Sequence, residues 1–203
     1  MDLVHAWVTG WAVSREAAAP VAQPYGFSIE VGQPGHVRRH VLPAADPDAL
    51  ERIVAATTTP GTWLKVFAPA EEVAPFLTPG WEIREPGFLM TRPLEEVTAV
   101  CPEGYEVVTE TAGTLTRVRI VVAGTGEEAA RGRIVAGAGS AVVDRVATEE
   151  PHRRRGLGSV VMRTLEGLGA GRTGVLAATR DGRALYGTLG WRLVAPLTSV
   201  VFG

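Results

Sequence analysis

Residues 148–158, TEEPHRRRGLG, lie between an apolar segment and a segment with helical periodicity. The segment before them, residues 141–147 (AVVDRVA), is rich in valine and predicts a buried or half-buried strand. After them, apolar side chains recur at positions 157, 160, 161, 165 and 168, the spacing of one helix face. The sequence therefore predicts a strand, a glycine-rich turn and a helix in direct succession.

This turn has the composition of an anion-binding loop. The first N–H groups of a helix have no partner within the helix, and the helix dipole is positive at that end. Gly156 and Gly158 carry no side chain, so phosphate oxygens could approach the backbone closely. Arg153, Arg154 and Arg155 add positive charge. We therefore expect this turn to bind an anion such as a pyrophosphate.

Two common phosphate-binding loops are excluded. No Gly-Lys-Ser/Thr follows the glycines, as a P-loop requires, and Val161 takes the place of the third glycine of the dinucleotide fingerprint. What remains is Arg-x-x-Gly-x-Gly at Arg153, Gly156 and Gly158, followed by residues 183–191, RALYGTLGW. In this order, the two motifs and the strands and helix around them resemble the GCN5-related N-acetyltransferase (GNAT) family.

The resemblance implies an α+β fold, a mixed and mostly antiparallel sheet flanked by helices. It implies an N-acetyltransferase that uses acetyl-CoA and no metal. The pyrophosphate would rest on backbone N–H groups of the loop, and the pantetheine arm would follow the exposed edge of the preceding strand. The cofactor-binding residues that it implies are Val146, Ala147, Thr148, Arg153, Arg154, Arg155, Gly156, Leu157, Gly158, Ser159, Thr179 and Tyr186.

Catalysis would need a proton donor and a base. Tyr186 falls where family members often carry the tyrosine that protonates the departing CoA thiolate, although a tyrosine packed on its helix is the alternative. A carboxylate could remove the proton of the ammonium acceptor. Glu149 and Glu150 are our candidates because they adjoin the predicted thioester position, with Asp144 and His152 as further choices. A surface or turn role remains open for each of these four.

The order of the predicted elements indicates that the chain consists of two similar halves. Each half combines strands, a helix, a further strand, a short helix that ends at Gly-Trp, and a final strand. Residues 1–95 lack the glycine loop, so we expect a degenerate GNAT-like half that binds no cofactor of its own. Residues 103–203 are the expected acetyl-CoA-binding half. Between residues 104 and 129 the two helices that usually wall the acceptor site are missing, so the first half should supply that wall.

The first half begins with residues 5–13 (HAWVTGWAV), 25–31 and 36–42, which predict three strands. Asp46 followed by Pro47 predicts the start of a helix, because an acidic N-cap and a proline at the first helical position favour one. Further strands are predicted at residues 62–67, 87–91, 105–109, 115–122, 129–135, 174–179 and 191–202.

Composition limits the partners and the compartment. The formal net charge is −2, so no global field attracts nucleic acid or an anionic membrane. A single cysteine excludes an intramolecular disulfide and fits a reducing cytoplasm. His36 and His40 have no third ligand, which makes a metal site a poor explanation for them. We expect a cytoplasmic protein that binds neither membrane nor nucleic acid.

The acceptor is the least determined part of the hypothesis. We expect a primary amine of a small molecule, with an aminoglycoside-like antibiotic as one option, supported only by the slightly acidic charge balance. A protein or peptide amine is an alternative acceptor. A non-catalytic module that binds acyl-CoA is the competing class of function. A homodimer is also an option.

Overall fold

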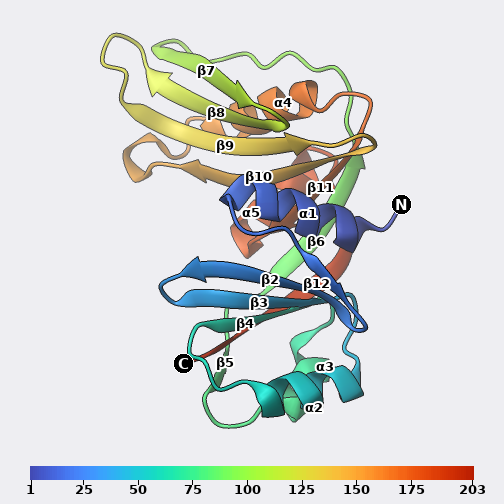
Figure 1. Ribbon diagram of the computed structural model, residues 1–203. Helices are drawn as coiled ribbons and strands as arrows, with labels where there is room; N and C mark the ends of the chain where they lie inside the picture. Colours follow the sequence, from blue (N-terminus) through green and yellow to red (C-terminus); the bar gives the residue numbers. More distant parts are fainter.

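The computed structural model describes residues 1–203, which form one mixed twelve-stranded sheet with five α-helices (Figure 1). The strands follow the order β1-β2-β3-β4-β12-β6-β11-β10-β9-β8-β7, and β5 pairs with β12 beside this path. All neighbours are antiparallel except β3–β4 and β10–β11. This confirms the predicted α+β class and the mostly antiparallel sheet.

The helices are α1 (Leu3–Arg15), α2 (Pro47–Ala56), α3 (Ala70–Val73), α4 (Leu157–Leu168) and α5 (Arg180–Thr188), with 3₁₀ turns η1 (Ala74–Phe76) and η2 (Glu150–His152). The first half contributes β1 (Val21–Gln23), β2 (Gly26–Gln33), β3 (His36–Leu42), β4 (Thr62–Val66), β5 (Trp81–Ile83) and β6 (Gly87–Pro93). The second contributes β7 (Tyr105–Ala112), β8 (Leu115–Val122), β9 (Glu128–Ala136), β10 (Ser140–Thr148), β11 (Thr173–Ala178) and β12 (Arg192–Phe202).

Helix α1 corrects the expectation of a strand at residues 5–13. The Asp2 side chain caps this helix by accepting hydrogen bonds from two N–H groups of the first turn. Trp7 and Trp11 lie one helical turn apart and are both buried. Tryptophan and valine favour strands on average, but here the cap and the burial of one helical face decide the conformation.

Each predicted half completes the sheet of the other. Strand β6, from the first half, lies between β11 and β12 and pairs with both. Strand β12, at the end of the chain, pairs in turn with β4 of the first half. Residues 94–104 connect the halves without a helix or strand. The division at residues 95 and 103 remains a prediction, since the sheet continues across it.

Helix α1 packs between the two parts of the sheet, beside β10 and β11 in Figure 1. Its tryptophans share one core with Val41 of β3 and with Val142 of β10. Gly10 faces Val142 with no room for a side chain, so the helix lies directly on the strand. Helix α4 covers the opposite face, where Gly132 of β9 allows a similar close approach. The first half thus supplies a helix on one face of the second half's strands, and its role as the wall of the acceptor site stays a prediction.

None of the helices combines the length and apolar character that crossing a membrane requires.

Candidate functional site

The two parallel strands in front of the glycine loop separate from each other. Strand β10 pairs with β11 only over residues 140–142, against residues 173–175. Residues 143–148 of β10 continue along β9 with no partner on the β11 side. The register shifts between Asp144 and Ala147, and Arg145 inside this bulge has a positive φ of 55°. The separated strands therefore leave a backbone edge open to an extended ligand.

A cavity of about 200 Å³ fills this separation. Residues of the bulge, the end of β11, helix α1 and helix α5 line it together. These residues are Arg15, Val143, Asp144, Arg145, Val146, Leu176, Ala177, Ala178, Thr179 and Tyr186. The structure thus brings together four candidate residues: Val146, Thr179 and Tyr186 of the implied cofactor site, and Asp144, one of the further choices of base.

The glycine loop presents a row of free donors next to this cavity. The backbone N–H groups of residues 154–158 donate to no acceptor in the protein, whereas those of Ser159 and Val160 bond to the Gly156 carbonyl oxygen. Arg154 and Gly156 have positive φ values of 63° and 80°, which turns successive N–H groups toward one side. A side chain at position 156 would meet open space, so this side of the loop is accessible. An anion can therefore bind against the backbone here.

The three arginines of the loop differ in their contacts. Arg154 is exposed and its side chain has no partner in the protein. Arg153 contacts the Thr148 carbonyl oxygen at 3.4 Å, and Arg155 donates to the Tyr105 hydroxyl at 3.0 Å. Arg154 is therefore the arginine whose charge is most available to a ligand at this loop.

Tyr186 lies on α5 with 8% of its surface exposed, and its hydroxyl is open to the cavity. Its oxygen has no hydrogen-bond partner, yet it is not among the fully buried unpaired atoms, so it must reach accessible space. Burial, and to a lesser extent the negative charge of Asp144, raises the pKa of Tyr186 to about 12. The phenol therefore keeps its proton at neutral pH.

Asp144 is the one carboxylate that lines the cavity, and α1 holds it. Its two oxygens accept hydrogen bonds from Arg15, at 2.6 Å from Nε and 2.9 Å from Nη2, and the Ser14 hydroxyl adds a third at 2.8 Å. Burial opposes the charged form, but these hydrogen bonds and the Arg15 charge hold the pKa of Asp144 below its usual value. A carboxylate held in this way is a poor base.

The other predicted bases do not line the cavity. Glu149 forms an ion pair with Arg131, and Glu150 is exposed on η2. The His152 ring faces the Tyr105 hydroxyl, with 3.0 Å between Nδ1 and the phenolic oxygen. A catalytic role for Glu149 or Glu150 stays a prediction, without support from their position.

The remaining loop residues contribute backbone rather than side chains. Leu157 is buried in the core, so only its N–H faces the loop. Gly158 approaches Leu185 of α5 closely, and Ser159 lies in the first turn of α4. Ala147 and Thr148 pair with β9 on the side away from β11.

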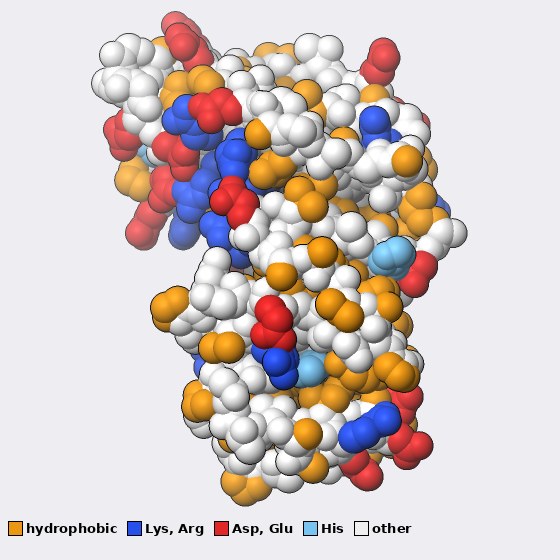
Figure 2. All heavy atoms as spheres, in the orientation of Figure 1, with side chains coloured by type: hydrophobic (Ala, Val, Ile, Leu, Met, Phe, Trp, Pro, Cys, Tyr) orange, Lys and Arg blue, Asp and Glu red, His pale blue; other side chains and the backbone are white.

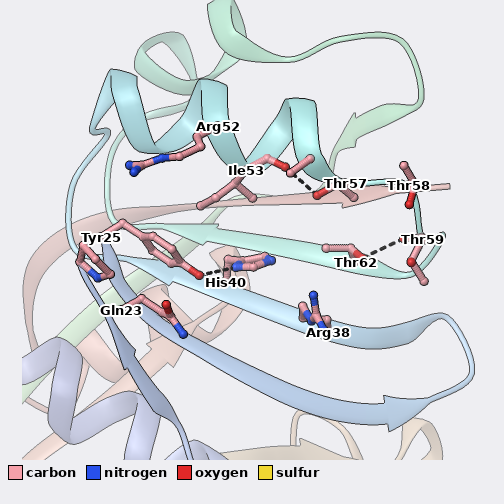
Figure 3. A pocket seen from close by; sticks show the side chains of 12 residues that line it. Gln23, Tyr25, Arg38, His40, Arg52, Ile53, Thr57, Thr58, Thr59 and Thr62 are labelled. Atoms are coloured by element: carbon pink, nitrogen blue, oxygen red, sulfur yellow. Dashed lines mark hydrogen bonds between the residues drawn. The ribbon is translucent and has the colours of Figure 1, made fainter.

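A larger cavity, of about 420 Å³, lies in the first half between α2 and the strands β2 to β4 (Figure 3). Tyr25 and His40 point toward each other there, with 2.7 Å between the phenolic oxygen and Nδ1. Arg38 and Arg52 face the cavity from β3 and α2. It contains none of the predicted site residues and has no glycine loop.

The corresponding parallel strands of the first half stay together. Strand β3 pairs with β4 from Arg38 through Leu42, its last residue. No separation comparable to that of β10 and β11 forms there. That the first half binds no acyl-CoA of its own stays a prediction.

Arg15, Ser14 and Trp11 are the site residues that sequence reasoning missed. They lie on α1, whose residues 5–13 were predicted as a strand, about 130 residues before Asp144 in the chain. No local signal in the sequence pairs them with the bulge. Correct assignment of α1, followed by its placement on β10, would have been needed to find them.

No family model matches the chain, and no curated protein is similar to it in sequence. Solved structures do share its fold. A GCN5-related N-acetyltransferase from Kribbella flavida is 15% identical with a TM-score of 0.66, over 100% of this chain and 96% of that one. A GNAT-family protein from Novosphingobium aromaticivorans is 18% identical with a TM-score of 0.60, over 99% and 96%.

A tandem GNAT protein from the clavulanic acid biosynthesis pathway is 15% identical with a TM-score of 0.50, over 69% of this chain and 63% of that one. At such identities the similarity is one of fold. The chain has the fold of the GCN5-related N-acetyltransferases.

Proposed function

We propose that the protein is an N-acetyltransferase that transfers the acetyl group of acetyl-CoA to a primary amine of a small molecule. One observation carries the proposal: five free N–H groups at residues 154–158 stand beside the unpaired edge of β10. The N–H row suits a pyrophosphate, and the open edge suits the amide groups of a pantetheine arm. The adjoining cavity would then receive the thioester.

Acetyl-CoA supplies an activated acetyl group: the amine nitrogen bonds to the carbonyl carbon, the carbon–sulfur bond breaks, and its electron pair leaves on sulfur. Tyr186 is our candidate for the group that meets this sulfur, because it lines the cavity beside the open edge of β10. With a pKa of about 12 its phenol is a weaker acid than a thiol, whose ordinary pKa is about 8.5. The hydroxyl therefore serves as a hydrogen-bond donor that stabilises the developing thiolate and keeps its own proton. CoA leaves as the thiolate, and the proton lost by the amine nitrogen passes to water.

Removal of the acceptor's proton has no assigned side chain. The one carboxylate in the cavity, Asp144, is neutralised by Arg15 and held at low pKa. The amine would therefore lose its proton to a water molecule, or bind in its neutral form, rather than lose the proton directly to a carboxylate. The transfer rate should then rise with pH, because a larger fraction of the amine is unprotonated at higher pH.

Calorimetric titration with acetyl-CoA tests the cofactor half of the proposal. Arg154→Glu places a negative charge beside the free N–H groups without removing any contact in the fold, so its Kd should rise at least tenfold. Arg52→Glu is the matched control, since it reverses a charge in the first-half cavity and should leave the Kd unchanged. Equal affinity in all three proteins would contradict the loop assignment.

The catalytic half needs a second measurement. Tyr186→Phe should bind acetyl-CoA with the wild-type Kd and lose at least tenfold in kcat. Wild-type binding without turnover on any amine would favour a non-catalytic acyl-CoA-binding module instead. Cytoplasmic location, an aminoglycoside-like or protein acceptor and a homodimer remain predictions of the sequence.

A further inference from the structure

A basic cluster, in which Arg39 is buried and Arg15 and Lys65 are partly buried, adjoins the cavity on the face covered by α1. We call Arg15, Arg39 and Lys65, together with the rings of Trp11 and His36 between them, the cationic cluster. The guanidinium carbons of Arg39 and Arg15 lie 3.6 and 5.6 Å from the centroid of the same Trp11 ring. Arg15 lines the cavity that contains Tyr186. The cluster therefore extends from the reaction cavity toward the first half.

Arg39 carries donors that nothing in the protein uses. It is only 5% exposed, and its Nε donates to His36 Nε2 at 3.2 Å. Its two terminal nitrogens have no partner, yet they are absent from the fully buried unpaired atoms. They must therefore contact accessible space. A buried guanidinium whose two terminal nitrogens are unpaired can donate hydrogen bonds to a planar anion such as a carboxylate.

The charge of the cluster is not balanced. Burial and the nearby Arg15 lower the pKa of Arg39 to about 9, although Asp144 opposes this. Burial, Arg39 and Arg15 together hold the pKa of Lys65 well below its ordinary value. Asp144 is the only carboxylate that acts on these groups, and Arg15 already occupies both of its oxygens. Burying several cations with one counter-charge destabilises the fold unless a ligand supplies another.

The arginines on the open sheet face behave differently. Figure 2 shows Lys and Arg side chains gathered on the left of the upper part of the molecule, with acidic side chains among them. Arg117, Arg119 and Arg131 of β8 and β9 form ion pairs with glutamates. These surface arginines have carboxylate partners, whereas the side chain of Arg39 contacts only the His36 ring through its Nε and the face of Trp11.

We propose that the cationic cluster binds a carboxylate of the acceptor, so that the substrate is an amine that also carries an acid group. The inference rests on the proposed acetyl transfer and names its substrate class. Arg39 would bind the carboxylate through its free N–H edges, and the carboxylate's negative charge would favour the protonated form of Lys65. The amine would lie on the Arg15 side, toward the cavity and Tyr186. The same charges repel a polycation such as an aminoglycoside.

Matched pairs of amines test this substrate class. The wild type is incubated with acetyl-CoA and common α- and ω-amino acids, their carboxamides, and kanamycin, and CoA release and product mass are measured. We expect at least one acid to be acetylated with kcat/KM at least tenfold above its carboxamide, because the amide lacks the charge that pairs with Arg39. Equal turnover of acids and carboxamides, or preference for kanamycin, overturns the proposal.

Two neighbouring arginines of β3 provide the variant and its control. Arg39→Gln should raise KM for the preferred acid at least tenfold while KM for its carboxamide stays unchanged. Arg38→Gln changes the adjacent residue, which faces the first-half cavity, and should behave like wild type. Arg39→Lys keeps the charge and should recover part of the loss. A purely structural Arg39 would instead impair acid and amide equally, which contradicts the proposal.

Acetyl-CoA titration distinguishes failure of the proposed substrate class from failure of the proposed acetyl transfer. If acetyl-CoA binds but no acid in the series is acetylated, the substrate class is wrong while the cofactor site stands. If acetyl-CoA does not bind the wild type, the proposed acetyl transfer fails and the substrate class falls with it. The same titration on Arg39→Gln reports whether the second half is still folded.

Discussion

Gly10→Ala should destabilise the fold although it improves the helix. An ideal Cβ at position 10 lies 2.4 Å from Cγ2 and 2.5 Å from Cβ of Val142, far below contact distance. A new rotamer of Val142 cannot relieve the second contact, because its Cβ is fixed to a central strand. Alanine gains about 1 kcal/mol of helix propensity. Overpacking costs about 1–3 kcal/mol in general. Because the contact with the Val142 Cβ cannot be relieved by a rotamer change, we expect a cost of about 2–3 kcal/mol here and a net loss of about 1–2 kcal/mol.

Gly187→Ala is the matched control, with the opposite sign. Gly187 lies on α5, and a Cβ there has nothing within 4 Å. The same substitution should therefore stabilise the protein by about 0.5–1 kcal/mol through the backbone alone. Comparison of the two variants removes the helix-propensity contribution and isolates the contact between α1 and β10.

Urea unfolding followed by circular dichroism measures both variants. A loss of 1 kcal/mol in a chain of this size corresponds to about 2–4 °C in Tm, so the opposed shifts are resolvable. Gly10→Ala with wild-type stability or better, alongside a stabilised Gly187→Ala, would refute the close packing of α1 on β10. Equal stabilisation of both would mean that α1 contributes to the fold only as an isolated helix.

Burial holds the pKa of His36 at about 3 and that of His40 at about 4, below the ordinary 6.5, so both are neutral in the fold. Their contribution to stability is complete above pH 6.5 and is lost as pH falls toward 3 for His36 and toward 4 for His40. The free energy of unfolding measured in urea should decline by less than about 1.4 kcal/mol per pH unit for each histidine, since both are partly exposed, and the double Gln variant should flatten this slope. Glu166→Ala should cost about 3–5 kcal/mol in thermal or urea unfolding, because buried Glu166 accepts a 2.8 Å hydrogen bond from Trp191 Nε1 and pairs with an arginine of β6. Residues 103–203 expressed alone should lack cooperative unfolding, since they lose β6 and α1; a folded fragment would show that the second half is independent.

Local patterns were sufficient for most of the elements. The Asp46–Pro47 signal and the alternation of β2 and β3 predicted their structures because caps, turns and strand periodicity act over a few residues. The glycine loop was also a local matter, since two glycines and a following apolar helix face specify free N–H groups at a helix start. The short strands β1 and β5 were not predicted, because three residues give no readable period.

The sequence by itself thus determined the α+β class, the anion loop and Tyr186 as a candidate donor. Only the tertiary structure decided that α1 is a helix, that β6 completes the second half's sheet, and that Arg15 neutralises Asp144. It also placed Arg39 beside the cavity through a shared tryptophan. Helix caps and glycine turns depend on residues a few positions apart, so they can be predicted from the sequence. Burial and charge pairing depend on which distant segments contact each other, and the local periodicity of the sequence does not indicate those contacts.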